Sequence, residues 1–276
     1  MFIFLDTLFF YVEENSLSDT ELSKNYCLIS GTSSGIGKYL SKQLPFAEKY
    51  DRSSPISKYQ NKEFDVIIHC AFDGSSSLGH KNLFEQLKSN ISLVQDLCSL
   101  NHKIFIFFSS IDVYPKKITL KSPDYRLGYG DLLSRQAFFK IMGESIVASK
   151  AKNFLILRPS LMIGEYARAN TFVNIIRGKE GPFTLSKNSM FNLITHDQVW
   201  FCLQAAFLKE IRGVMNLCSG LYVSLDEVAR KVKNNNISWG DYDYQTPKIE
   251  DSNTIKLLGG TDYKIEDLIS KVISWK

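Results

Sequence analysis

The sequence predicts an α/β protein built on a doubly wound parallel β-sheet, and three observations support this prediction. Short, unbroken apolar runs recur along the chain, at residues 26–30, 64–71, 104–108 and 154–157. Between them lie segments in which apolar residues have helical spacing, such as residues 82–100 and 135–151. The length of 276 residues and the hydrophobic fraction of 44% suit one large α/β domain, or one domain with a small appended lobe. Strands that alternate with helices form right-handed crossover units and lie parallel in one sheet.

The strands are assigned from unbroken apolar runs because strands of a parallel sheet are buried on both faces. The first strand ends at Gly31, and a helix follows over residues 38–44 until Pro45 stops it. Residues 46–50 form a weaker, polar strand. The later sequence predicts a helix at residues 196–208, a short strand at residues 214–217, and amphipathic helices at residues 225–233 and 265–274.

The composition is that of an ordinary globular protein, and it argues against a nucleic-acid-binding protein, a disulfide-bonded protein and a metalloprotein. The net charge of +4 is too small for a nucleic-acid footprint. The five cysteines form no CxxC pair, so we expect free, buried thiols in a reducing, cytoplasmic compartment. The four histidines lack metal-ligand spacing, and we expect no metal site.

The first twelve residues, MFIFLDTLFFYV, are almost entirely apolar. They lack a basic region and a cleavage site, and they are too short to cross a bilayer. We expect an extra element docked on the core or on a partner subunit, with contact to a membrane surface as the alternative. Residues 13–25 are polar and indicate a linker.

A glycine-rich loop, residues 31–37, lies where the first strand gives way to a helix. Gly31 allows a tight turn, Gly35 lets backbone approach a pyrophosphate, and Gly37 lets the helix pack closely on the sheet. The loop also contains Ser33, Ser34 and Ile36. Because a strand precedes it and a helix follows, the loop predicts dinucleotide binding in a Rossmann-type core.

The choice between NAD and NADP stays open. An acidic residue about 20 positions after the loop binds the ribose hydroxyls of NAD, whereas a basic residue suits the 2′-phosphate of NADP. Asp51 and Arg52 stand side by side at this distance. Either cofactor is therefore compatible with the sequence, and a plain surface pair is the structural alternative.

Several motifs together resemble the extended short-chain dehydrogenase/reductase family, also described as the NAD-dependent epimerase/dehydratase family. They occur in the family's order and cover roughly residues 26–276. The motifs are SGTSSGIG, VIIHCA ending at Ala71, NISLVQDLC opening at Asn90, SSIDVY, KIMGE, ILRPSLMIG containing Pro159, THDQV, NLCSG, VSLDEVA and KLLGG. This resemblance implies that Ala71, Lys140 and Pro159 contact the cofactor.

The resemblance divides the chain into three parts. Residues 1–25 are an N-terminal apolar extension and linker, and residues 26–165 are the dinucleotide-binding core. Residues 166–276 are a small C-terminal substrate lobe, interleaved with the last core strand and helices. Tyr166, Arg168, Asn170, Asn174, Arg177 and Lys179 are expected near a nucleotide diphosphate, and residues 239–244, WGDYDY, are expected to form a surface loop.

The same resemblance implies a catalytic Ser or Thr, a Tyr and a Lys. Ser110 fits the hydroxyl role and Lys140 fits the Lys role. The family's Tyr lies four residues before the Lys, and here that position is Gln136. An amide can hydrogen-bond a substrate oxygen but cannot shuttle its proton near neutral pH.

Three explanations for Gln136 stay open. The protein binds cofactor and sugar nucleotide with little or no turnover, or another group takes over the acid–base role, or the alignment is locally shifted. Candidates for a replacement are Tyr129, upstream of Gln136, and Asp112, where dehydratases of the family carry an acid.

We therefore expect an NAD(P)-dependent nucleotide-sugar epimerase, dehydratase or ketosugar reductase, serving surface-polysaccharide synthesis. The alternative is a catalytically silent dinucleotide-binding regulatory or scaffold protein. The expected partner is a small-molecule substrate, a nucleotide sugar, with no nucleic acid and no membrane. We also expect a homodimer formed by the helices at residues 84–100 and 135–149, with Phe138, Phe139 and Met142 on the shared face.

Overall fold

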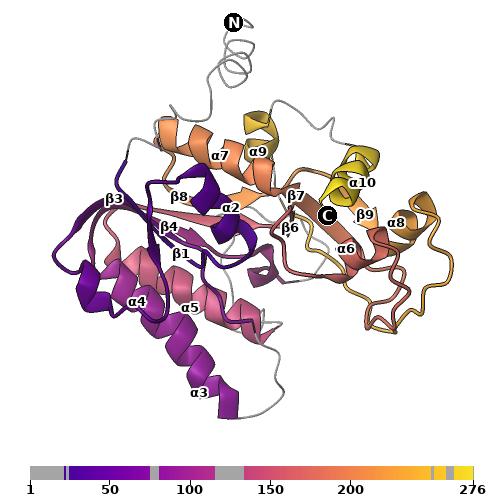
Figure 1. The fold of residues 1–276 in the computed structure, drawn as a ribbon, viewed down its shortest axis with the longest axis horizontal. Coiled ribbons are helices and arrows are strands. Elements are labelled where there is room, and N and C mark those ends of the chain that lie inside the picture. Colours follow the sequence, from indigo (N-terminus) through magenta and orange to yellow (C-terminus); the bar gives the residue numbers. More distant parts are fainter. Residues whose placement is uncertain are drawn as a thin grey trace, which may run out of the picture.

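A computed structural model of the chain describes residues 22, 25–74, 81–115, 134–249, 252–258 and 264–275. Its centre is a six-stranded, fully parallel sheet in the order β2-β1-β3-β4-β5-β8 (Figure 1). The strands are β1 (Cys27–Ser30), β2 (Glu48–Tyr50), β3 (Glu63–His69), β4 (Asn101–Phe108), β5 (Phe154–Pro159) and β8 (Gly213–Leu217). The predicted fold class is confirmed.

Helices cover both faces of this sheet (Figure 1). On one face lie α2 (Gly35–Gln43), α7 (His196–Leu208) and α9 (Ser252–Leu257), and their apolar side chains pack on those of the strands. On the other face lie α3 (Lys81–Leu87), a π-helical turn (Lys88–Ser92), α4 (Leu93–Cys98) and α5 (Arg135–Lys150). Because β1 has β2 on one side and β3 on the other, the carboxyl ends of β1 and β3 form a topological switch point, where such sheets bind ligands.

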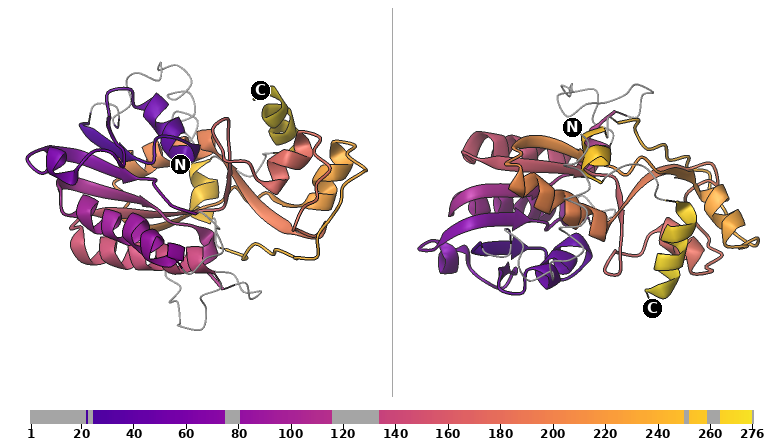
Figure 2. Two further views of the ribbon diagram at one scale, coloured as in Figure 1. Left: turned by 60° about the horizontal axis from the view of Figure 1, so that its bottom comes forward. Right: turned by 90° about the horizontal axis from the view of Figure 1, so that it is seen from above.

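A second, three-stranded sheet extends beside the first (Figure 2). It comprises β6 (Leu161–Ile163), β7 (Met190–Thr195) and β9 (Tyr222–Ser224), with β7 parallel to β6 and antiparallel to β9. The helices α6 (Thr171–Ile176), α8 (Leu225–Lys231) and α10 (Ile265–Ser274) share a separate apolar core with it. This sheet was not predicted from the sequence. After β7 the chain returns to the central sheet through α7 and β8, and it enters the second sheet again at β9.

Local signals explain several boundaries. Thr195 accepts a hydrogen bond from the Gln198 amide while the Gln198 side chain accepts one from the Thr195 amide, so a capping box starts α7. The helix predicted at residues 82–100 contains the π-helical turn, and its Asn90 side chain bonds both backbone groups of Asp73. Asn90 thereby fixes the segment after β3. Short 3₁₀ turns occur at Ile56–Tyr59 and Ile111–Val113.

The remaining expectations have mixed outcomes. All five cysteines are free, and Cys70 alone among them is not fully buried. No helix in the described ranges is long and apolar enough to cross a bilayer. Residues 1–12 lie outside the described residues. Phe139 is buried in the core, whereas Phe84 and Phe138 are exposed on the helices expected to form a dimer; the dimer stays a prediction.

Candidate active site

The glycine loop has the geometry expected of it. Gly31 has a φ of 79°, and a Cβ there would lie 2.6 Å from the amide nitrogen of Ala71, which follows β3. A Cβ on Gly37 would collide with the Gly31 carbonyl oxygen, so α2 packs closely on the turn. Gly35 has a φ of 59° and no atom within 4 Å of its Cβ position. Backbone atoms therefore fill the space next to Gly31 and Gly37, whereas the space next to Gly35 is open.

One cavity of about 900 Å³ lies over the carboxyl ends of the central strands and reaches the second sheet. It brings together most of the residues singled out from the sequence: Gly31, Ser33, Ser34, Gly35, Ile36, Gly37, Asp51, Arg52, Ala71, Ser110, Asp112 and Gln136. Pro159 ends β5 beside the cavity-lining Ser160. Tyr129 lies outside the described residues.

Asp51 directly follows β2, at one end of the cavity. Its Oδ1 accepts hydrogen bonds from the Ser53 amide and the Ser54 amide, at 2.8 and 3.1 Å. Hydrogen bonds from the Ser53 hydroxyl and the Ser53 amide lower the pKa of the Asp51 carboxyl, so it is ionised at neutral pH. The cavity thus carries a fixed negative charge at this end.

Lys140 is buried beneath the cavity wall. Its Nζ donates to the Phe108 carbonyl oxygen at 2.6 Å and lies 4.3 Å from the centre of the Phe72 ring. Phe72 lines the cavity, so its ring separates the ammonium from the open space. Burial lowers the pKa of Lys140 to about 8.

Ser110 and Asp112 share one turn after β4. The Ser110 Oγ accepts a hydrogen bond of 3.1 Å from the Asp112 amide and caps the 3₁₀ turn. Gln136 lies in the first turn of α5 and also lines the cavity. A Cβ on Gly74 would lie 3.7 Å from the Gln136 Nε2. The hydroxyl, the carboxylate and the amide are thus presented to one space.

Part of the chain matches a known protein family. Residues 48–177 match the model of the NAD dependent epimerase/dehydratase family. The matched segment is a little less than half of the chain. No curated protein sequence matches the chain. The resemblance expected from the sequence is confirmed.

Solved structures of epimerases and reductases share the fold. MoeE5 in complex with UDP-glucuronic acid and NAD aligns with a TM-score of 0.73 and 17% identity, over 91% of this chain and 98% of that one. UDP-glucuronic acid 4-epimerase from Bacillus cereus, in complex with UDP-glucuronic acid and NAD, aligns with a TM-score of 0.72 and 17% identity, also over 91% of this chain and 98% of that one. A dTDP-4-dehydrorhamnose reductase from Clostridium acetobutylicum aligns with a TM-score of 0.67 and 12% identity, over 89% and 97%. The TM-scores show a shared fold, and identities this low show no more than that.

The cavity also contains a residue that was not predicted from the sequence. The expectation of a surface loop at residues 239–244 is wrong for Tyr244, which lines the cavity and stacks on Phe191 with ring centres 4.8 Å apart. The Tyr244 hydroxyl donates to Asp112 Oδ1 at 2.8 Å. The two residues are 132 positions apart, so no local pattern signals their contact. Tyr242, in contrast, is 55% exposed.

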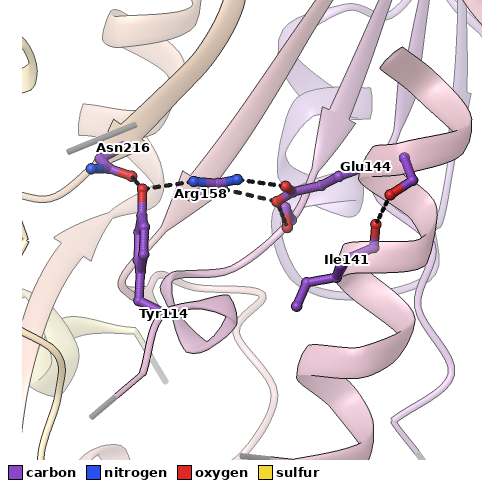
Figure 3. A network of polar contacts seen from close by, with 7 residues as sticks. Tyr114, Ile141, Glu144, Arg158 and Asn216 are labelled. Atoms are coloured by element: carbon purple, nitrogen blue, oxygen red, sulfur yellow. Dashed lines mark hydrogen bonds and ion pairs between the residues drawn. The ribbon is translucent and has the colours of Figure 1, made fainter. Parts of the chain in front are cut away.

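A buried polar network supports the turn that carries Ser110 and Asp112 (Figure 3). Arg158 donates to both carboxylate oxygens of Glu144, from Nε at 2.9 Å and from Nη2 at 2.6 Å. Its Nη1 donates to the Tyr114 hydroxyl, which donates to Asn216. The Ser109 hydroxyl donates to Glu144 Oε1 at 2.5 Å. The network therefore ties both ends of this turn, at Ser109 and Tyr114, to α5, β5 and β8.

The segment after β6 crosses the glycine loop. The Gly35 amide donates to the Tyr166 carbonyl oxygen at 2.7 Å, and Arg168 Nε donates to the Ser34 Oγ at 3.3 Å. Lys38 Nζ lies 4.8 Å from the centre of the Tyr166 ring. Arg168 thus holds a positive charge over the open side of the loop.

Three buried residues of the cavity wall have polar atoms without a hydrogen-bond partner. They are Ser160, Asn192 and His196. Among the described residues, the only other buried side-chain atom of this kind is the Trp200 Nε1. Buried polar groups are nearly always hydrogen-bonded in folded proteins, so their concentration here favours a polar ligand or ordered water in the cavity.

Proposed function

We propose that the chain is an NAD(P)-dependent oxidoreductase that acts on a carbinol or keto group of a nucleotide sugar. The observation that carries the proposal is the single cavity, which joins the glycine loop to the hydroxyl and carboxyl groups of Ser110, Asp112 and Tyr244. The reaction is of the epimerase, dehydratase or ketosugar reductase class. The role in surface-polysaccharide synthesis stays a prediction.

The residues present fit a dinucleotide. The open space above Gly35 accommodates a pyrophosphate, and the N-terminus of the nine-residue helix α2 and the Arg168 guanidinium supply positive charge there. The Gly35 amide is engaged by Tyr166, so the segment at 164–170 must release it for a phosphate oxygen to accept its hydrogen bond. The ionised Asp51 at the end of β2 is suited to accepting hydrogen bonds from ribose hydroxyls.

When bound, the nicotinamide supplies a hydride acceptor or donor. The chain's own groups then have separable tasks. The Ser110 Oγ accepts a hydrogen bond from the Asp112 amide. The Ser110 hydroxyl hydrogen is then left to donate to a substrate oxygen and orient it. Gln136 can position the substrate by hydrogen bonds. Lys140 lies behind Phe72 and donates a hydrogen bond to the Phe108 carbonyl oxygen at the end of β4.

The sugar nucleotide is proposed to occupy the end of the cavity at the second sheet. MoeE5 and the Bacillus cereus epimerase, which share the fold, bind UDP-glucuronic acid. The buried, unpartnered groups of Ser160, Asn192 and His196 lie in that part of the wall. Hydroxyl-rich ligands satisfy such groups, and apolar ligands do not.

The proposal is tested by mixing the protein with NAD or NADP and UDP- or dTDP-hexoses, while nicotinamide fluorescence and sugar products are followed. We expect turnover of at least one sugar and its loss in Ser110→Ala. Ser145→Ala is the matched control, because its hydroxyl donates to the Ile141 carbonyl oxygen on the exposed side of α5. Binding of both ligands without turnover would support the silent alternative, and binding of neither would overturn the proposal.

A further inference from the structure

The family's acid–base tyrosine is absent at Gln136, yet a tyrosine and a carboxylate meet elsewhere in the same cavity. Tyr244 comes from the segment that follows α8, and Asp112 comes from the turn after β4. Their side chains are joined by a hydrogen bond of 2.8 Å from the Tyr244 hydroxyl to Asp112 Oδ1. Both are partly buried, and both line the cavity with Ser110 and Gln136.

We propose that Asp112 and Tyr244 form the acid–base pair of this active site and replace the missing tyrosine of α5. The inference rests on the proposed function and assigns its proton transfer. Tyr244 is the group that touches the substrate oxygen, and Asp112 is the group that holds the proton.

The proton balance is as follows for oxidation of a substrate carbinol. The carbinol hydrogen leaves as hydride to the oxidised nicotinamide dinucleotide. The hydroxyl proton passes to the Tyr244 oxygen while the Tyr244 proton passes to Asp112 Oδ1. The products are a carbonyl group, the reduced dinucleotide and a protonated Asp112. Reduction of a ketosugar runs the same path backwards, with Asp112 as the source of the proton.

The local structure suits a relay through a neutral phenol. Burial raises the pKa of Tyr244, and the Asp112 charge raises it further, so the phenol stays protonated and acts as a relay. Stacking on Phe191 fixes the ring, and the Tyr244 amide donates to the Ser189 Oγ at 3.0 Å. The Asp112 amide is held by Ser110. Each partner is therefore positioned by its own element, and the contact joins the second lobe to the central sheet.

The experiment compares Asp112→Asn and Tyr244→Phe with Tyr242→Phe, a matched control in the same segment whose ring is 55% exposed. Loss of a general acid–base group lowers turnover by about a hundredfold to ten-thousandfold, and we expect this for Asp112→Asn and at least the lower value for Tyr244→Phe. Substrate and dinucleotide Kd values from calorimetry are expected to change less than about threefold, because proton transfer rather than binding is removed.

A second measurement needs no cofactor. Tyrosinate absorbance is titrated in the unliganded protein, and the difference between wild type and Tyr244→Phe isolates Tyr244. Asp112→Asn removes the charge that opposes ionisation, so Tyr244 is expected to ionise at lower pH in that variant. An unchanged Tyr244 titration in Asp112→Asn, or turnover retained within threefold in both variants of an active wild type, would overturn the inference while the proposed function stands. A wild type that binds no dinucleotide and converts no nucleotide sugar overturns the proposed function, and the inference with it.

Discussion

Removing the Glu144 carboxylate is expected to destabilise the fold strongly. Arg158 and Glu144 have side chains only 6% and 10% exposed, and Arg158 holds both carboxylate oxygens. Breaking a buried ion pair by removing one partner costs about 3–5 kcal/mol, because the remaining charge stays buried. Glu144→Ala also removes the acceptor of the Ser109 hydroxyl, so the upper half of this range applies. At about 2–4 °C per kcal/mol, the melting temperature falls by roughly 10 °C or more.

The assay is thermal and urea unfolding of Glu144→Ala beside Arg230→Ala. Arg230 pairs with Asp226 across one turn of α8, where the side chains are 72% and 42% exposed, and such surface pairs contribute below about 1 kcal/mol. Replacing both buried partners, with Glu144→Leu and Arg158→Met together, is expected to recover much of the loss. A melting temperature of Glu144→Ala equal to that of Arg230→Ala would refute the reasoning.

Three further predictions concern the cavity. Because Asp51 is ionised at the end of β2, NAD is expected to bind at least about tenfold more tightly than NADP, and Asp51→Ala is expected to reduce this ratio of Kd values. Calorimetry with both cofactors measures the ratio, and tighter binding of NADP by the wild type contradicts the prediction. Burial lowers the pKa of Lys140 to about 8 from the ordinary 10.5, so between pH 8 and 10.5 the unfolded chain binds more protons at this group than the folded chain does. The contribution of Lys140 to the free energy of unfolding therefore rises with pH across this range. The difference in free energy of unfolding in urea between wild type and Lys140→Met should change across this range, and a constant difference contradicts burial of the ammonium. Gln136→Tyr restores a phenol on α5 and is expected to raise the turnover of Tyr244→Phe at least about tenfold, whereas no gain in that background would show that position 136 cannot reach the reacting oxygen.

The sequence predicted the central sheet well because its strands are unbroken apolar runs and its helices have clear periodicity. The helix predicted at residues 196–208 has those bounds in the structure, since a capping box marks its start. The second sheet lacked such signals. Its strands β6 and β9 have three residues each, and β7 pairs with partners far along the chain. Their existence depends on tertiary pairing rather than on local pattern.

In the site, too, some features could be predicted from local sequence and others depend on tertiary packing. The glycine loop and Ser110 follow from position at strand ends, which local sequence reveals. The contact of Tyr244 with Asp112 depends on how the second lobe packs on the sheet, and no spacing rule reports it. The covering of Lys140 by Phe72 also depends on packing, because Phe72 comes from the segment after β3 that Asn90 fixes.

Binding of a nicotinamide dinucleotide at the glycine loop is the central claim, and calorimetric titration of a matched pair of glycine variants tests it most directly. Gly35 and Gly178 both have positive φ and no atom within 4 Å of their Cβ positions, but only Gly35 lines the cavity. Both Gly35→Val and Gly178→Val strain the backbone, and only the former places a side chain where the pyrophosphate is proposed to lie. We predict that wild type and Gly178→Val bind NAD(H) and that Gly35→Val does not. Absence of NAD(H) and NADP(H) binding in wild type, or equal binding by Gly35→Val, would contradict the account.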